Sequence, residues 1–254
     1  MKVRVVVPVL HSETLVAKAH DEYRRASGPD TDLSLVTLPQ GTETIESEYD
    51  LALAQPETIR MVVEAEQLGM DGCIIACFGD PGSTGAKEAV SIPVVGEGEA
   101  ALHLAALLGY RYSIITIRAA TVSFMRNMAV NAGLDSRLAS IRPVDFRVMD
   151  FSLSSMDDVV EQATAAVRED GADVIVMGCT GTGVDMAALV EARLRNRVRT
   201  YIPVIDPVKA AISLLEGLMR ARLSQSKRAY PTPQSLRPEY RFADPVERMS
   251  RQER

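Results

Sequence analysis

The chain has 254 residues, 46% of them hydrophobic, and carries a formal net charge of −6. This length allows two small α/β lobes or one large one. The acidic balance argues against a nucleic-acid partner. No apolar run approaches the roughly 18–20 residues that cross a bilayer, which argues against a membrane partner.

The N-terminus, the cysteines and the histidines bear on location and on metal binding. Met1-Lys2 leads directly into a strand pattern with no small-residue cleavage site, so we expect no signal peptide and a cytoplasmic protein. Three cysteines in a chain of this length do not make a secretory disulfide framework. The histidines, at positions 11, 20 and 103, are not at metal-ligand spacing, so we expect no metal site.

Strand-like and helix-like patterns alternate along the chain. The expected strands cover, in order, residues 3–7, 33–38, 72–77, 92–95, 112–117, part of 141–151, 171–179 and 201–205. The expected helices cover residues 15–26, 55–68, 83–90, 99–108, 119–132, 155–169, 186–194 and 207–221. A polar loop at 41–50 follows the second strand, where open α/β sheets place ligand contacts. This alternation predicts mostly parallel sheets with right-handed crossovers.

Two stretches of the chain resemble each other. Gly69 and Gly171 each precede a cysteine, Cys77 or Cys179, by eight positions, and an aspartate lies two positions after each glycine. The tetrapeptide Ile92-Pro93-Val94-Val95 likewise matches the one at 202–205. Any two parallel β-α stretches share some likeness, but equal offsets at several residue types favour a unit that recurs after roughly one hundred residues. We therefore predict an α/β fold with two pseudo-symmetric Rossmann-like lobes and an active site in the cleft between them.

Cys77 and Cys179 each end an expected strand before a glycine-rich loop, so both thiols are expected to point into that cleft. Racemisation at a carbon next to a carbonyl needs a base on one face of the carbon and an acid on the other. A thiol pKa, near 8.5 when unperturbed, moves toward neutrality beside oriented backbone N–H groups. The same N–H groups would stabilise an enolate oxygen. The pattern indicates a two-cysteine acid–base site, whereas Cys73, in mid-strand, is interpreted as a buried hydrophobe.

Residues near the strand ends are candidates for substrate binding. They are Phe78, Gly79, Asp80, Thr116, Thr180 and Gly181. Phe78 is either a wall of the pocket or part of the core. Asp80 either orients Cys77 or a substrate N–H, or serves only the turn before Pro81. Thr180 either donates to a ligand oxygen or bonds within its own loop.

Four segments carry a resemblance to a known family. They are Ala76-Cys77-Phe78-Gly79-Asp80-Pro81-Gly82, Ile92-Pro93-Val94-Val95-Gly96 with Glu99-Ala100-Ala101, Gly178-Cys179-Thr180-Gly181, and Ile202-Pro203-Val204-Ile205-Asp206-Pro207. Together they resemble the Asp/Glu/hydantoin racemase superfamily over residues 3–219. The first segment, and Ile45-Glu46-Ser47-Glu48-Tyr49-Asp50, are most similar to its hydantoin and allantoin racemase branch.

The resemblance implies catalysis of a small-molecule substrate without a cofactor, with Cys77 and Cys179 as the two acid/base groups, and it implies a homo-oligomer. It divides the chain into a first lobe at 1–98 plus about 208–223 and a second lobe at 99–207. The segment 224–254, where prolines break the periodicity and Lys and Arg are frequent, is interpreted from its composition as an extended arm. The family usually carries Asn-Pro-Asn after the first strand, where substrate polar groups are held. In this chain the matching residues are Val7-Pro8-Val9. The resemblance therefore places Pro8 at the substrate, but the side-chain amides of both asparagines are missing.

Three alternatives stay open beside a hydantoin- or allantoin-type racemase. The same fold would suit an isomerase of maleate-like diacids or a decarboxylase of malonates, the former with Cys77 as a nucleophile. The Cys-Thr pair at 179–180 is nearer to that of the amino-acid (Asp/Glu) racemases. Two lobes around a cleft also describe small-molecule binding modules, although binding alone needs no matched pair of thiols.

Overall fold

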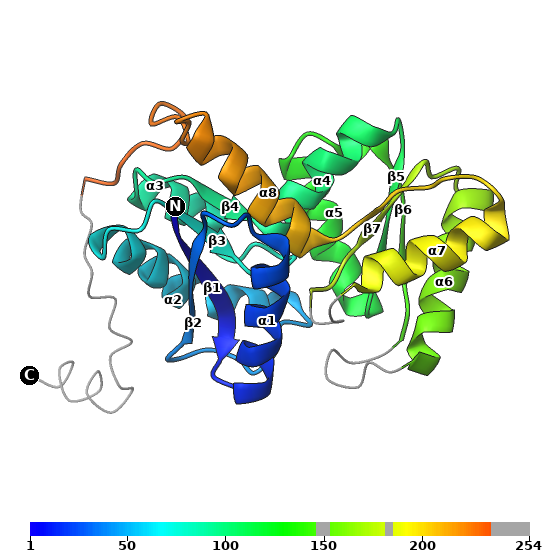
Figure 1. Cartoon of the computed structure of the whole chain (residues 1–254), viewed down its shortest axis with the longest axis horizontal. Coiled ribbons are helices and arrows are strands. Elements are labelled where there is room, and N and C mark those ends of the chain that lie inside the picture. Colours follow the sequence, from blue (N-terminus) through cyan, green and yellow to red (C-terminus); the bar gives the residue numbers. More distant parts are fainter. Residues whose placement is uncertain (146–152, 181–184, 235–254) are drawn as a thin grey trace, which may run out of the picture.

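A computed structural model of the chain describes residues 1–145, 153–180 and 185–234. Within this part, eight strands form two four-stranded sheets in which every strand pairing is parallel. The first sheet, in the order β2-β1-β3-β4, contains β1 (Lys2–Leu10), β2 (Asp32–Leu38), β3 (Gly72–Ile75) and β4 (Val94–Gly96). The second, in the order β6-β5-β7-β8, contains β5 (Tyr112–Thr116), β6 (Leu138–Pro143), β7 (Val174–Met177) and β8 (Val204–Ile205). Equal strand orders confirm the expected α/β fold with two pseudo-symmetric lobes (Figure 1).

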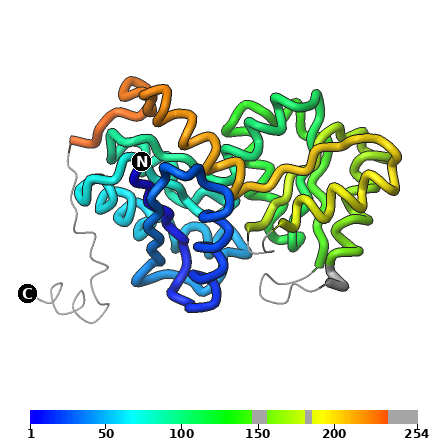
Figure 2. Tube along the Cα trace, viewed as in Figure 1, coloured from blue at the N-terminus to red at the C-terminus, as the bar shows by residue number. Residues whose placement is uncertain are grey.

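The helices form three layers around the two sheets (Figure 2). The outer face of the first sheet carries α2 (Glu48–Gln67) and α3 (Ser83–Ala89), and that of the second carries α6 (Leu153–Arg168) and α7 (Met186–Val198). The central core joins residues of both sheets with α1 (Glu13–Ala26), α4 (Glu97–Leu108), α5 (Val122–Asn131) and α8 (Pro207–Arg220). Two short 3₁₀ helices, Ala119–Thr121 and Asp135–Arg137, complete these elements. Because one core serves both lobes, the lobes are packed together rather than linked loosely.

Several element boundaries differ from the sequence-based expectation, each for a local reason. The first strand does not end at Pro8 but continues to Leu10, with an irregularity in its pairing to β2 between Val7 and Leu10. Proline has no N–H for the ladder, so pairing skips it and resumes beyond it. The loop expected at 41–50 is shorter, because Ser47 caps α2 by accepting the Asp50 N–H at 3.2 Å.

The paired glycines and aspartates of the repeat have the same structural role in both lobes. Gly69 and Gly171 have φ angles of 74° and 71°, which glycine adopts without steric cost. Asp71 accepts the N–H of Lys2 at 2.7 Å, and Asp173 accepts the N–H of Arg111 at 2.9 Å. Each carboxylate precedes the strand that leads to a cysteine, β3 or β7. It thus holds the start of the neighbouring strand, β1 or β5, in place.

The first part of the expected arm, residues 224–230, packs on the chain itself. The Lys227 Nζ donates to three carbonyl oxygens at the end of α3, those of Lys87 at 2.9 Å, Glu88 at 2.9 Å and Val90 at 2.6 Å. The Gln225 amide bonds to the carbonyls of Val90 and Ile92, both at 2.9 Å. A cation is favourable at this end of a helix, where carbonyl groups lack partners.

Lys227→Met is expected to destabilise the protein by about 1–2 kcal/mol, because three charge-assisted bonds are lost at a half-buried site. Urea denaturation gives the stability, and amide exchange at 83–92 and 224–230 should rise selectively. Arg228→Met removes the same charge from an exposed neighbour and serves as the control. Equal denaturation midpoints for the two variants would show that the contact is not stabilising.

None of the helices in the described part of the chain has the length and apolar character that a membrane-spanning segment requires.

Candidate active site

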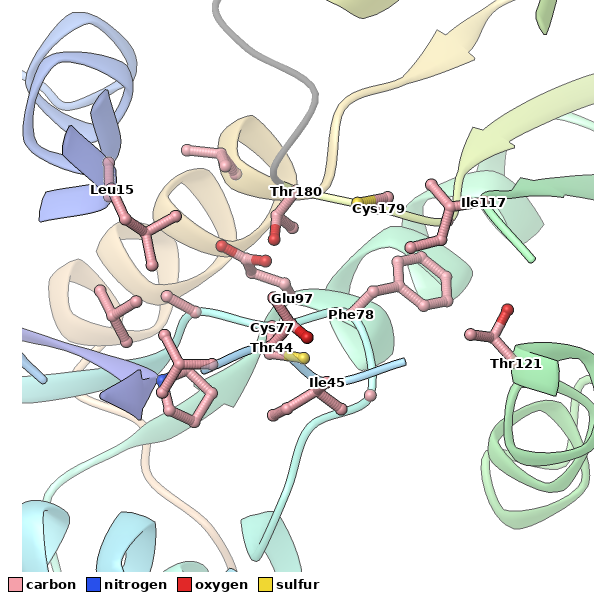
Figure 3. Close-up of a pocket in the computed structure, with 18 of the residues that line it drawn as sticks. Leu15, Thr44, Ile45, Cys77, Phe78, Glu97, Ile117, Thr121, Cys179 and Thr180 are labelled. Carbon is pink, nitrogen blue, oxygen red and sulfur yellow. The ribbon is translucent and has the colours of Figure 1, made fainter. Parts of the chain in front are cut away.

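A cavity of about 110 Å³ lies between the two lobes at the carboxyl ends of the strands (Figure 3). From the first lobe and α8 it is lined by Val7, Pro8, Val9, Leu15, Lys18, Ala19, Glu22, Tyr23, Glu43, Thr44, Ile45, Ala76, Cys77, Phe78, Gly79, Glu97 and Val208. From the second lobe it is lined by Ile117, Thr121, Phe124, Met125, Gly178, Cys179 and Thr180. The wall is mostly apolar, which lowers the local dielectric and strengthens the interactions of its polar groups.

Both strand-end cysteines line this one cavity, as their equal spacing predicts. Neither cysteine is inside its strand: β3 ends at Ile75 and β7 at Met177, so each thiol lies two residues beyond its strand. The Cys77 and Cys179 side chains are half-buried, and none of the three cysteines forms a disulfide bond. Cys73, by contrast, is fully buried within β3 and does not line the cavity.

The surroundings of Cys77 favour its neutral thiol. Burial raises the pKa of Cys77, and the nearby Glu97, Asp80 and Cys179 add to the rise. The Gly79 N–H donates to the Cys77 sulfur and works against this shift. A side chain at Gly79 would meet Leu51 Cδ1 at 2.5 Å, so a larger residue there would require the Leu51 side chain to move.

The other predicted site residues divide into two groups. Pro8, Phe78, Gly79 and Thr180 line the cavity, and Phe78 is also part of the core at 3% exposure. Gly181 lies outside the described residues. The polar loop contributes Glu43, Thr44 and Ile45, as its place after β2 indicates.

Asp80 does not line this cavity but fixes the segment that carries Cys77. Its carboxylate accepts the N–H groups of Gly98 at 3.0 Å and Glu99 at 2.7 Å, at the beginning of α4. Helix α4 has no side-chain cap of its own, so Asp80 supplies one from 18 positions away. Burial raises the pKa of Asp80 to about 8, against the effect of these two hydrogen bonds. Its role is therefore to join the Cys77 loop to α4.

Thr116 also lies behind the cavity wall rather than in it. The side chain is fully buried and its hydroxyl is 2.6 Å from that of Thr121, which does line the cavity. Because the Thr121 hydroxyl donates to the Arg118 carbonyl at 2.8 Å, Thr116 donates to Thr121. Thr116 thus supports a wall residue from the second lobe.

Sequence analysis missed a group of titratable side chains in the cavity. Glu97 is 1% exposed and accepts a hydrogen bond from the Tyr23 hydroxyl, while Lys18 and Glu22 lie on the same helix as Tyr23. Of the described residues that line the cavity, Lys18 alone has a basic side chain. One signal for Glu97 was present in the sequence: it directly follows a buried strand and stands between two glycines. The sequence-based interpretation gave this position no chemical role.

Glu22 makes the stability of the fold depend on pH. Burial raises its pKa from 4.5 to about 7, with Lys18 opposing the shift. A carboxyl whose pKa is raised on folding stabilises the fold below its unfolded pKa, and this contribution is lost as the pH rises through the folded value. We therefore expect the wild type to lose stability relative to Glu22→Gln between pH 4.5 and about 7.

The expected difference is roughly 1–2 kcal/mol, below the full linkage value because Glu22 is only half-buried. Urea denaturation across this pH range measures it. Glu13→Gln alters an exposed residue of the same helix and should follow the wild type at every pH. Parallel stability curves for wild type and Glu22→Gln would contradict the assignment.

The chain matches known proteins over most of its length. The Asp/Glu/hydantoin racemase family model matches residues 8–215. A hydantoin racemase from Paenarthrobacter aurescens is 34% identical over 231 residues, which are 89% of this chain and 94% of that protein. One from Pseudomonas sp. (strain NS671) is 31% identical over 89% of both chains. The crystal structure of allantoin racemase from Pseudomonas fluorescens superposes with a TM-score of 0.83 at 33% identity, covering 93% of this chain and 99% of that one.

Two α/β lobes with a shared cavity, together with these matches, define an isomerase of the racemase class. The chain belongs to the Asp/Glu/hydantoin racemase family. The resemblance noted in the sequence is thereby confirmed.

Proposed function

We propose that this protein is a cofactor-independent racemase of 5-substituted hydantoins or related ureides such as allantoin, with Cys77 and Cys179 as its acid–base pair. The observation that carries the proposal is the presence of both thiols in one cavity of a chain 31–34% identical to hydantoin racemases. The thiols come from different lobes, so a planar intermediate between them would present one face to each.

The chemistry follows from this placement. The thiolate on one face removes the proton from the carbon next to the carbonyl, and the electron pair of that C–H bond moves into an enolate. The thiol on the other face then gives its proton to the same carbon, which inverts the centre and leaves the two cysteines with exchanged protonation states. Burial raises the pKa of Cys77, which favours its thiol form and suits it to the acid role.

The charges of the cavity favour a neutral substrate over a dianion. Three carboxyl groups, those of Glu22, Glu43 and Glu97, line it beside one basic side chain, Lys18, among the described residues. Dicarboxylic amino acids, malonates and maleate-like acids each carry two carboxylates, and one basic side chain cannot neutralise both of them. A hydantoin ring is neutral or singly ionised and offers both carbonyl and N–H groups.

The test is incubation of single enantiomers in D₂O, using 5-substituted hydantoins, allantoin, aspartate, glutamate, an arylmalonate and maleate. We expect optical rotation to decay for a hydantoin or ureide, with one deuterium entering at the stereocentre. The same incubation without protein gives the spontaneous rate. Unchanged rotation and retained protium across the panel would overturn the proposal, and decarboxylation or cis–trans isomerisation would replace it with the alternative reaction.

A further inference from the structure

The Glu97–Tyr23 pair places a buried acid in the cavity that the two thiols line. Glu97 is the first residue of α4 and lines the cavity with Cys77 and Cys179 (Figure 3). One carboxyl oxygen, Oε1, accepts the Tyr23 hydroxyl proton. The other, Oε2, is buried and has no hydrogen-bond partner among the described residues. A buried polar atom without a partner costs free energy, so its presence on a residue that lines a cavity points to a ligand.

The position of Glu97 is fixed by close packing on the Cys77 loop. A side chain at Gly98 would lie 2.0 Å from the Phe78 carbonyl oxygen, and one at Gly96 would lie 2.2 Å from the Asp80 carboxyl carbon. The two glycines therefore let the beginning of α4 approach the loop, and Asp80 holds it there through the amides of Gly98 and Glu99. This fixes Glu97 relative to Cys77.

The groups facing Glu97 make ionisation unfavourable. Around it lie Tyr23, Glu22 and Lys18 on α1, Asp80 after β3, Asp206 at the start of α8, and the thiols of Cys77 and Cys179. Burial raises the pKa of Glu97, the carboxyls of Asp80, Glu22 and Asp206 raise it further, and only the Tyr23 hydrogen bond opposes them. Burial and Glu97 likewise raise the pKa of Tyr23, which remains a neutral donor.

We propose that Glu97 is a neutral acid that donates a hydrogen bond from Oε2 to the carbonyl oxygen of the substrate. This inference rests on the proposed racemase function. It implies that the substrate oxygen bound by Glu97 belongs to an uncharged carbonyl group and not to a carboxylate. Because Oε1 accepts from Tyr23, the acid proton belongs on Oε2, the second oxygen of a residue that lines the cavity. There it has no acceptor among the described residues of the chain.

The donor acts at the step where charge develops. When one thiolate removes the C–H proton, the electron pair passes through the new C=C bond to the carbonyl oxygen, which becomes an enolate oxygen. The Oε2–H bond stays intact and its hydrogen bond shortens as that oxygen gains charge. When the opposite thiol protonates the carbon, the carbonyl is restored and Glu97 is unchanged. A neutral carboxylic acid serves this purpose in a low-dielectric site because an ionised one would repel the enolate.

The test compares Glu97→Gln with Glu97→Leu. The glutamine amide keeps a carbonyl oxygen for Tyr23 and an N–H for the substrate, so we expect its kcat to stay within about tenfold of the wild type, whereas leucine should lower kcat by at least about 10²-fold. The wild-type to Glu97→Gln ratio of kcat/KM should fall with rising pH, since only the wild type can ionise. Glu161→Gln, on the exposed face of α6, should keep the wild-type profile.

A glutamine variant as inactive as the leucine variant would overturn the donor role, because it would show that the substrate needs a carboxylate acceptor. A fully active leucine variant would remove Glu97 from the reaction. An infrared difference spectrum between wild type and Glu97→Gln at neutral pH gives a readout without substrate: a protonated carboxyl band is expected, and a carboxylate band would overturn the proposal. If the wild type racemises nothing while the protonated band is present, the proposed function fails separately from this assignment.

Discussion

Cys77→Ser and Cys179→Ser should each lower kcat/KM for racemisation by at least about 10²-fold, the usual loss on removing a general acid or base. A serine hydroxyl is far less acidic than a thiol, so it neither holds the negative charge nor returns a proton at neutral pH. The double variant should be little worse than either single one, because the two groups act as a unit. Chiral chromatography of a single enantiomer over time measures the loss.

The single variants also test whether the thiols work on opposite faces. With one thiol left, a proton can leave and return only on one side, so any remaining deuterium exchange should occur with retained configuration. Cys73→Ala is the matched control, because Cys73 is the third cysteine and does not line the cavity. It should keep the catalytic rate and lose about 1 kcal/mol of stability. Full activity in either serine variant would exclude that cysteine from the mechanism.

Gly98→Ala should affect both stability and catalysis. The added methyl group would lie 2.0 Å from the Phe78 carbonyl oxygen and 2.2 Å from Met128 Cε, and the first of these is backbone that cannot rotate away. Overpacking of this kind costs about 1–3 kcal/mol. The strain would shift the Cys77 loop against α4, and a misplacement of about 1 Å in a catalytic group costs on the order of 10²-fold in rate.

Thermal unfolding and racemisation rates together check this expectation. Gly217→Ala is the matched control: it lies in α8, and an added methyl group there meets nothing within 4 Å. That substitution should stabilise the protein by up to about 1 kcal/mol, because alanine favours helix. Wild-type stability and activity in Gly98→Ala would show that the contact between α4 and the loop is not tight.

The domain pattern was readable from the sequence because its signals are local. Alternating apolar periods give strands and helices in turn, and glycines at 69 and 171 stand where the backbone needs a positive φ. Equal spacing from these glycines to Cys77 and Cys179 indicated two equivalent strand ends, and parallel sheets bring such ends to one edge. That reasoning placed both thiols in the same cavity.

Element ends were less predictable because their caps lie elsewhere in the chain. The helix expected from residue 99 begins at Glu97, since Asp80, from another loop, binds its first free amides. The strands expected to reach the cysteines end two residues earlier, and the segments that follow them line the cavity. Neither cause is visible within a short window of sequence.

By itself the sequence determined the doubled α/β fold, the family and the two cysteines, because period, turn residues and spacing are properties of neighbouring residues. Only the tertiary structure decided which polar side chains share the cavity with them. Tyr23 and Glu97 are 74 positions apart, and nothing local marks them as partners. Whether a carboxyl is ionised, neutral or exposed depends on the burial and charges that distant segments bring to it, so the chemistry of this wall emerges only on folding.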